Sequence, residues 1–226
     1  MIKYTLYLLL FCFVVNCDSP SVKQLNWDEE YTKQGLVPVD TLNNPIKVEL
    51  RYSTSNNFVG KDVYGSLEMA YLQPETNEKL TTAAKILDKK YPDLTFVIWD
   101  AARPRRIQQV LWDSVDVSAE ERPMYVANPE TGSIHNFGGA LDITLAHKNG
   151  SFLDMGTDYD NFTNIAHIDK EQELVTGGLL TELQVQNRQI LRSVLEEAGF
   201  IPLQSEWWHF DAFSREETKR RFTIIE

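Results

Sequence analysis

Cysteine is almost absent from this sequence of 226 residues, because its two cysteines, Cys12 and Cys17, both lie within the first 17 positions. The chain after Cys17 can therefore form no internal disulfide and offers no thiolate to a metal ion. For this main part of the chain, the absence excludes a disulfide-stabilised scaffold and the cysteine-rich structural metal modules.

Basic residues are also scarce relative to acidic ones. The chain has 22 Lys and Arg against 33 Asp and Glu, a formal net charge of -11, and its one local basic group is Arg103, Arg105 and Arg106. Because such an excess of negative charge repels phosphate backbones, we expect no nucleic-acid partner. A hydrophobic content of 42% with 11% aromatics is enough for a sizeable core and excludes a disordered acidic chain.

The sequence has no apolar run of the roughly 20 residues that a membrane-spanning helix needs. The shorter run Tyr4–Val15 follows Lys3 and is typical of a secretory signal peptide. Cys17 stands directly before the polar residues 18–20, and this junction resembles the lipobox of bacterial lipoproteins. We therefore expect residues 1–16 to be a lipoprotein signal peptide and Cys17 to carry a lipid anchor. The alternative is an ordinary signal peptide, or an uncleaved anchor, with an incidental cysteine.

The rest of the chain indicates one domain. Residues 17–45 show no sustained period and are expected to form a lipidated tether and an extended N-terminal arm before a domain at 46–226. Apolar alternation or short buried runs predict strands over 46–52, 94–99, 140–146 and 204–210. Helical spacing of apolar residues predicts helices over 75–90, 104–115 and 181–198, and the charged segment 215–221 is expected to be a surface helix. This irregular mixture predicts a compact α+β domain with a small central antiparallel sheet flanked by helices.

Two of the four histidines stand in polar motifs flanked by aromatic residues. His135 is followed by Gly138–Gly139 and Asp142, and His209 comes directly after two tryptophans. A glycine-containing turn lets the chain reverse, so Asp142 can return to the position of His135. Two imidazoles and one carboxylate suit a catalytic zinc ion, which takes three protein ligands and leaves a fourth position open. Either motif alone would be weak, because a buried histidine with one hydrogen bond is commoner than a ligand.

Glu206 precedes His209 by three residues. In a regular strand this spacing places the two side chains on opposite faces, so they approach each other only if the strand bends. We predict such a bend. A carboxylate near the metal, but not bound to it, can take a proton from the attacking water and pass it to a leaving amine.

These motifs resemble those of the zinc D-alanyl-D-alanine dipeptidases, a branch of a peptidase family that also holds D,D- and L,D-carboxypeptidases. The family patterns Ser-x-His-x(6)-Asp, Glu-x-Trp-His and Trp-Asp-x-x-Arg-Pro are matched at 133–142, 206–209 and 99–104. The resemblance implies one Zn²⁺ per chain, with Glu206 as the base and Arg103 as the group that stabilises the oxyanion. It also implies that the zinc ligands are His135, Asp142 and His209. The residues that it implies for substrate binding are Tyr52, Asp100 and Ser133.

The resemblance implies hydrolysis of D-alanyl-D-alanine to two D-alanine molecules in cell-wall peptide metabolism. With the predicted anchor at Cys17, the enzyme would lie on the periplasmic side of the bacterial cell envelope. One alternative is an envelope-anchored D,D- or L,D-carboxypeptidase that trims peptidoglycan stem peptides. Another is a non-catalytic lipoprotein that binds wall peptides.

Overall fold

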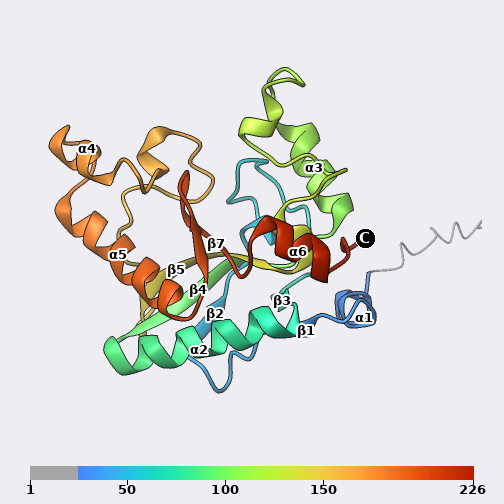
Figure 1. Cartoon of the computed structure of the whole chain (residues 1–226), viewed down its shortest axis with the longest axis horizontal. Helices are drawn as coiled ribbons and strands as arrows, with labels where there is room; N and C mark the ends of the chain where they lie inside the picture. Colours follow the sequence, from blue (N-terminus) through green and yellow to red (C-terminus); the bar gives the residue numbers. More distant parts are fainter. Residues whose placement is uncertain (1–24) are drawn as a thin grey trace, which may run out of the picture.

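The structure is a computed structural model that describes residues 25–226, so the predicted signal peptide and Cys17 lie outside the described residues. The described chain forms the expected α+β domain, with helices around a central sheet (Figure 1). Among the helices of residues 25–226, none is both long and apolar enough to cross a membrane.

A five-stranded sheet forms the centre of the domain. Its strands, in spatial order, are β2 (Ile46–Val48), β4 (Leu94–Asp100), β5 (Ala140–His147), β7 (Glu206–Asp211) and β6 (Ile201–Leu203). The predicted antiparallel pairing holds for three of the four neighbouring pairs, and the exception is β2, which runs parallel to β4. Parallel neighbours need a crossover connection, and helix α2 (Pro74–Lys90) lies in the segment between these two strands.

Helix α2 and helix α5 (Glu182–Glu197) pack together against one side of the sheet (Figure 1). Their buried stripes include Leu80, Leu87, Leu191 and Leu195, which are completely buried, as the helical spacing predicts. Three shorter helices follow α2 in the chain, α3 (Arg105–Ser114), α4 (Glu171–Thr176) and α6 (Arg215–Arg221). A two-stranded sheet pairs β1 (Val37–Pro38) with β3 (Tyr71–Leu72).

The extended arm expected before residue 46 contains a helix, α1 (Trp27–Lys33). The Asn26 side chain accepts a hydrogen bond from the backbone N–H of Glu29, which caps the helix start. Trp27 and Tyr31 are four residues apart, so they share one face, and both are buried. The Tyr31 hydroxyl donates to the carbonyl of Ala102 at 2.8 Å. The compact body of the protein therefore begins well before residue 46.

Two predicted strands have different limits in the structure. The strand expected over 46–52 ends at Val48, and Arg51–Ser53 form a 3₁₀ turn that places Tyr52. The strand expected over 204–210 spans Glu206–Asp211, and residues 201–203 before it form the edge strand β6.

Candidate active site

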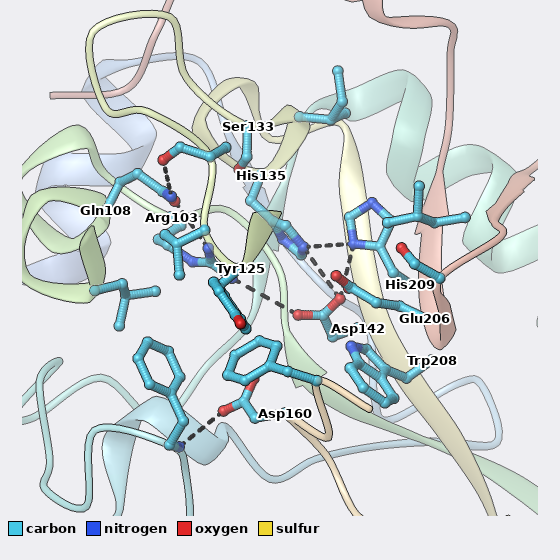
Figure 2. Close-up of a pocket in the computed structure, with 18 of the residues that line it drawn as sticks. Arg103, Gln108, Tyr125, Ser133, His135, Asp142, Asp160, Glu206, Trp208 and His209 are labelled. Atoms are coloured by element: carbon cyan, nitrogen blue, oxygen red, sulfur yellow. Dashed lines mark hydrogen bonds and ion pairs between the residues drawn. The ribbon is translucent and has the colours of Figure 1, made fainter. Parts of the chain in front are cut away.

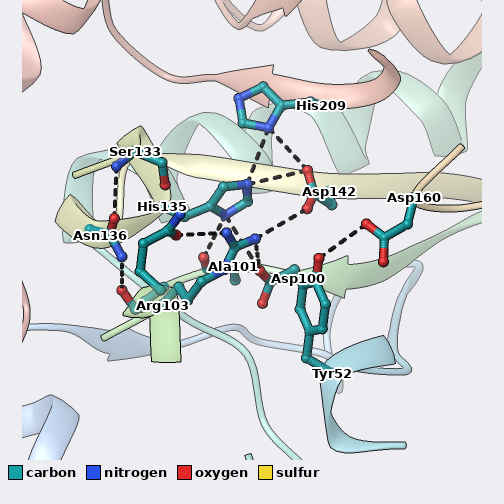
Figure 3. Close-up of polar contacts among 12 residues, drawn as sticks. Tyr52, Asp100, Ala101, Arg103, Ser133, His135, Asn136, Asp142, Asp160 and His209 are labelled. Carbon is teal, nitrogen blue, oxygen red and sulfur yellow. Dashed lines mark hydrogen bonds and ion pairs between the residues drawn. The ribbon is translucent and has the colours of Figure 1, made fainter. Parts of the chain in front are cut away.

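Three side chains converge over the centre of the sheet. His135 comes from the 3₁₀ helix Ile134–Phe137, while Asp142 of β5 and His209 of β7 are directly paired across neighbouring strands. His135 Nε2 lies 3.1 Å from His209 Nδ1, and Asp142 Oδ1 lies 3.2 Å from the first atom and 3.0 Å from the second (Figure 3). All three residues are buried. The structure thus brings together the three predicted metal ligands.

The turn between His135 and Asp142 depends on glycine. Gly138 has a φ of +68°, in the left-handed region, and a Cβ at this position would lie 2.7 Å from Cδ2 of Leu36. Any other residue would therefore strain the backbone and displace Leu36. The reversal expected from the glycine pair is present, and it returns the chain from His135 to the start of β5.

The outer nitrogen of each imidazole has a hydrogen-bond acceptor. His135 Nδ1 lies 2.7 Å from the carbonyl oxygen of Ala101, and His209 Nε2 lies 2.9 Å from the Asp211 carboxylate. A proton on each of these nitrogens leaves His135 Nε2 and His209 Nδ1 with lone pairs directed at each other and at Asp142. Three converging lone pairs repel unless a cation lies between them.

The spacing of these atoms fits a small tetrahedral metal ion. Bonds of about 2.0–2.1 Å from Zn²⁺ to nitrogen and oxygen place neighbouring ligands about 3.3 Å apart, close to the separations in this triangle. Tyr159 donates from its hydroxyl to Asp142 Oδ2 at 2.7 Å, which fixes the carboxylate with Oδ1 facing the histidines. Burial alone would raise the pKa of Asp142, but His135 and His209 hold that pKa well below its ordinary value.

Glu206 stands beside this triangle at the first position of β7 (Figure 2). The register between β6 and β7 shifts here: Pro202 pairs with Phe210, whereas the next residue, Leu203, pairs with Glu206. The predicted bend is therefore confirmed, and Glu206 and His209 both line the same pocket. Burial raises the pKa of the Glu206 carboxyl, which makes its carboxylate a stronger base.

Arg103 is held rigidly at the junction between β4 and α3. Its Nε donates to Asp100 Oδ2 at 2.8 Å, and its Nη1 donates to Gln108 Oε1 at 2.9 Å. Asp100 also accepts a hydrogen bond from the Tyr64 hydroxyl at 2.8 Å, is buried and does not line the pocket. The prediction that Asp100 binds substrate therefore needs correction, because its contacts make it the group that orients Arg103.

A pocket with a cavity volume of about 280 Å³ surrounds these groups. Figure 2 shows Ser133 and Asp160 at opposite ends of it, with His135, Asp142 and His209 between the two ends. Tyr52 also lines the pocket, and its hydroxyl donates to Asp160 Oδ1 at 3.0 Å. Both Tyr52 and Ser133 thus lie where the sequence analysis expects substrate-binding residues.

Asp160 is a site residue that the sequence analysis does not single out. Within residues 25–226 it is the only residue other than glycine with a positive φ, at 56°. Its Oδ2 accepts the backbone N–H of Phe58 at 3.1 Å, and it forms no ion pair within this part of the chain. Burial raises its pKa to about 7. A strained backbone and an unneutralised carboxylate in a pocket are typical of a binding residue.

Hydrogen bonds hold together the two segments that carry Arg103 and His135. The Arg103 N–H donates to the carbonyl of His135 at 3.0 Å, and the Asn136 side chain donates to the carbonyl of Arg103 at 2.7 Å. Ile225 joins them from the far end of the chain, because its N–H donates to Asn136 at 2.7 Å and its carbonyl accepts the N–H of Arg105 at 2.8 Å. The site is therefore held together by three distant parts of the sequence.

Two imidazoles and a carboxylate around a metal-sized space, beside a second carboxylate and a fixed guanidinium, define the site of a metal-dependent hydrolase. Comparison with known proteins identifies the family of hydrolases to which the chain belongs. A family model described as D-Ala-D-Ala dipeptidase matches residues 32–225, and the chain belongs to this metallopeptidase family.

The chain is similar to curated proteins named D-alanyl-D-alanine dipeptidase from several bacteria. The protein of Escherichia coli is 29% identical over 177 residues, which cover 78% of this chain and 83% of that protein. The protein of Enterococcus faecalis is 24% identical, with coverage of 79% and 91%, and that of Streptomyces coelicolor is 26% identical, with coverage of 76% and 88%. Each match covers most of both chains, so the likeness extends over the whole domain.

Proposed function

We propose that this protein is a zinc-dependent dipeptidase that hydrolyses D-alanyl-D-alanine to two D-alanine molecules. The observation that carries the proposal is the convergence of three possible ligand atoms, of His135, Asp142 and His209, in a small pocket that also contains Glu206. The family membership and the names of the relatives, which are D-alanyl-D-alanine dipeptidases, support the same substrate.

Zinc is the proposed metal because the ligand set is two nitrogens and one oxygen with near-tetrahedral spacing. When bound, Zn²⁺ supplies Lewis-acid polarisation of the peptide carbonyl and acidifies water. His135, Asp142 and His209 would hold it. Ala101 and Asp211 keep the two imidazoles in the tautomers that binding requires.

Glu206 is proposed as the general base and then the general acid. It removes a proton from the water that attacks the scissile carbonyl and afterwards protonates the leaving amine of the second alanine. Its raised pKa suits both steps, since the group must accept and release a proton at neutral pH. Arg103 is proposed to stabilise the developing oxyanion, because Asp100 and Gln108 fix its guanidinium before substrate arrives.

Asp160 and Tyr52 suit the ammonium group of the dipeptide. An ammonium beside Asp160 would offset the cost of ionising this buried carboxyl, which otherwise has a pKa of about 7. The peptide bond then lies near His135, Asp142 and His209, and the second residue extends toward Ser133. A substrate with an acylated N-terminus, such as a stem peptide, lacks the charge that Asp160 would neutralise.

The decisive experiment offers zinc-loaded protein D-alanyl-D-alanine and a stem pentapeptide ending in D-Ala-D-Ala, and measures released D-alanine. We expect cleavage of the dipeptide and little or none of the pentapeptide. Cleavage of the pentapeptide alone would replace the proposal with a carboxypeptidase. Cleavage of neither, with substrate binding retained, would support a wall-peptide-binding protein.

We propose further that the protein is a lipoprotein of the bacterial cell envelope, with the domain on the periplasmic side. The support is the sequence alone: an apolar signal segment followed by Cys17. Labelled palmitate should enter the wild-type protein and Cys12→Ala, but not Cys17→Ala, when each is produced in a bacterium that lipidates lipoproteins. Labelling of Cys17→Ala, or none of the wild type, would contradict the anchor.

A further inference from the structure

The pocket end opposite Asp160 contains an arginine that the proposed mechanism does not use. Arg215, the first residue of α6, lines the pocket, and its Nη2 donates to the carbonyl of Gly132 at 2.7 Å. Gly132 directly precedes Ser133, which also lines the pocket. Arg215 therefore brings a positive charge to the Ser133 end of the pocket.

This end of the pocket has a hydroxyl without a hydrogen-bond partner and a guanidinium without an ion-pair partner in the described chain. The Ser133 hydroxyl is buried and has no hydrogen-bond partner within the described chain. Arg215 forms no ion pair with any carboxylate of residues 25–226, whereas the other pocket guanidinium, that of Arg103, is ion-paired with Asp100. A buried hydroxyl without a partner costs free energy, so a ligand that accepts from it would be favoured.

The two ends of the pocket differ in charge. Asp160 supplies a carboxylate at one end, and Arg215 supplies a guanidinium at the other. A dipeptide has the opposite arrangement, an ammonium and a carboxylate separated by two residues, or about 7 Å of extended chain. If the ammonium lies at Asp160, the α-carboxylate must lie toward Ser133 and Arg215.

We propose that Arg215 is a specificity-determining residue that, with Ser133, binds the free α-carboxylate of the substrate's C-terminal residue. The inference rests on the proposed dipeptidase function and deepens it, because it makes the enzyme select dipeptides by the charges at both ends. Peptides whose C-terminus is amidated lack the charge that Arg215 recognises and bind weakly for that reason.

The test compares two substrates, D-alanyl-D-alanine and its C-terminal carboxamide, on zinc-loaded protein. Arg215→Gln should raise KM for the free dipeptide roughly ten- to a hundredfold, the range expected for a lost charged hydrogen bond, with little change in kcat. Its kinetics on the carboxamide should equal those of the wild type. Arg215→Lys keeps the charge and should recover part of the selectivity.

Arg220→Gln is the matched control, because Arg220 is an exposed arginine of the same helix that does not line the pocket. It should leave both substrates unaffected. Equal effects of Arg215→Gln on the two substrates, or none on either, would overturn the inference while the dipeptidase function stands. If the wild type cleaves neither substrate, the proposed function fails as well.

Discussion

Replacement of Asp211 by alanine tests how the metal site is held. The Asp211 carboxylate accepts a hydrogen bond from His209 Nε2 at 2.9 Å, and this bond keeps the lone pair of Nδ1 facing His135 and Asp142. Losing such an orienting partner lowers metal affinity about ten- to a hundredfold. Because the Asp211 side chain is 22% exposed, water partly screens its bond, so we expect the lower end of this range.

The effect should depend on pH. In the metal-free protein burial lowers the pKa of His209, but Asp211 and Asp142 outweigh it and raise that pKa well above its ordinary value, so protons compete with the metal. Asp211→Ala lowers the pKa of His209 and weakens this competition. The loss of affinity should therefore be largest at about pH 8.5 and smaller at about pH 6.5.

Zinc dissociation constants from competition with a chromophoric chelator measure the effect directly. Asp113→Ala is a suitable control, since Asp113 is an exposed carboxylate on α3 whose only side-chain partner in the described chain is Gln109. The reasoning fails if Asp211→Ala and Asp113→Ala bind zinc equally tightly at both pH values while both remain folded.

Three further changes test other parts of the site. Glu206→Gln should keep zinc affinity but reduce turnover by about two to four orders of magnitude, and turnover near the wild-type rate would exclude Glu206 as the base. Because burial raises the pKa of Asp160 above its unfolded value, to about 7, the stability of the wild type relative to Asp160→Asn should fall as pH rises from about 4 to 7. Urea unfolding of both proteins across that range measures this difference, and a difference that does not change with pH would contradict the prediction. Gly138→Ala should destabilise the fold by about 1–3 kcal/mol in urea unfolding, owing to its φ of +68° and the contact with Leu36, and an unchanged midpoint would contradict this.

The longest helices were predictable because each has a sustained apolar stripe. Helices α2 and α5 differ from their predicted ranges by one residue at each end at most. Helix α1 has only seven residues, too few for a clear period, although Asn26 followed by acidic residues is a start signal. The parallel pairing of β2 with β4 joins segments far apart in the chain, and no local pattern specifies it.

The proposed ligands were found from the sequence because each lies in a short motif with characteristic spacing. Asp211 was within reach of the same reasoning, since a residue two positions after His209 shares its face of a strand. Asp160 could not be found from the sequence in this way, because its place in the pocket depends on a loop conformation with a positive φ. Asp100 was correctly located but assigned to substrate, since only the structure shows both of its oxygens engaged by Arg103 and Tyr64.

The backbone hydrogen bonds of Ile225 affect the order in which parts of the site can come together during synthesis. Its N–H and carbonyl bridge Asn136 and Arg105, the neighbours of a proposed metal ligand and of the oxyanion-stabilising segment. During synthesis these two segments exist long before residue 225 is added. A nascent chain that has not yet reached residue 225 therefore lacks this hydrogen-bonded link between the segments that carry Arg103 and His135.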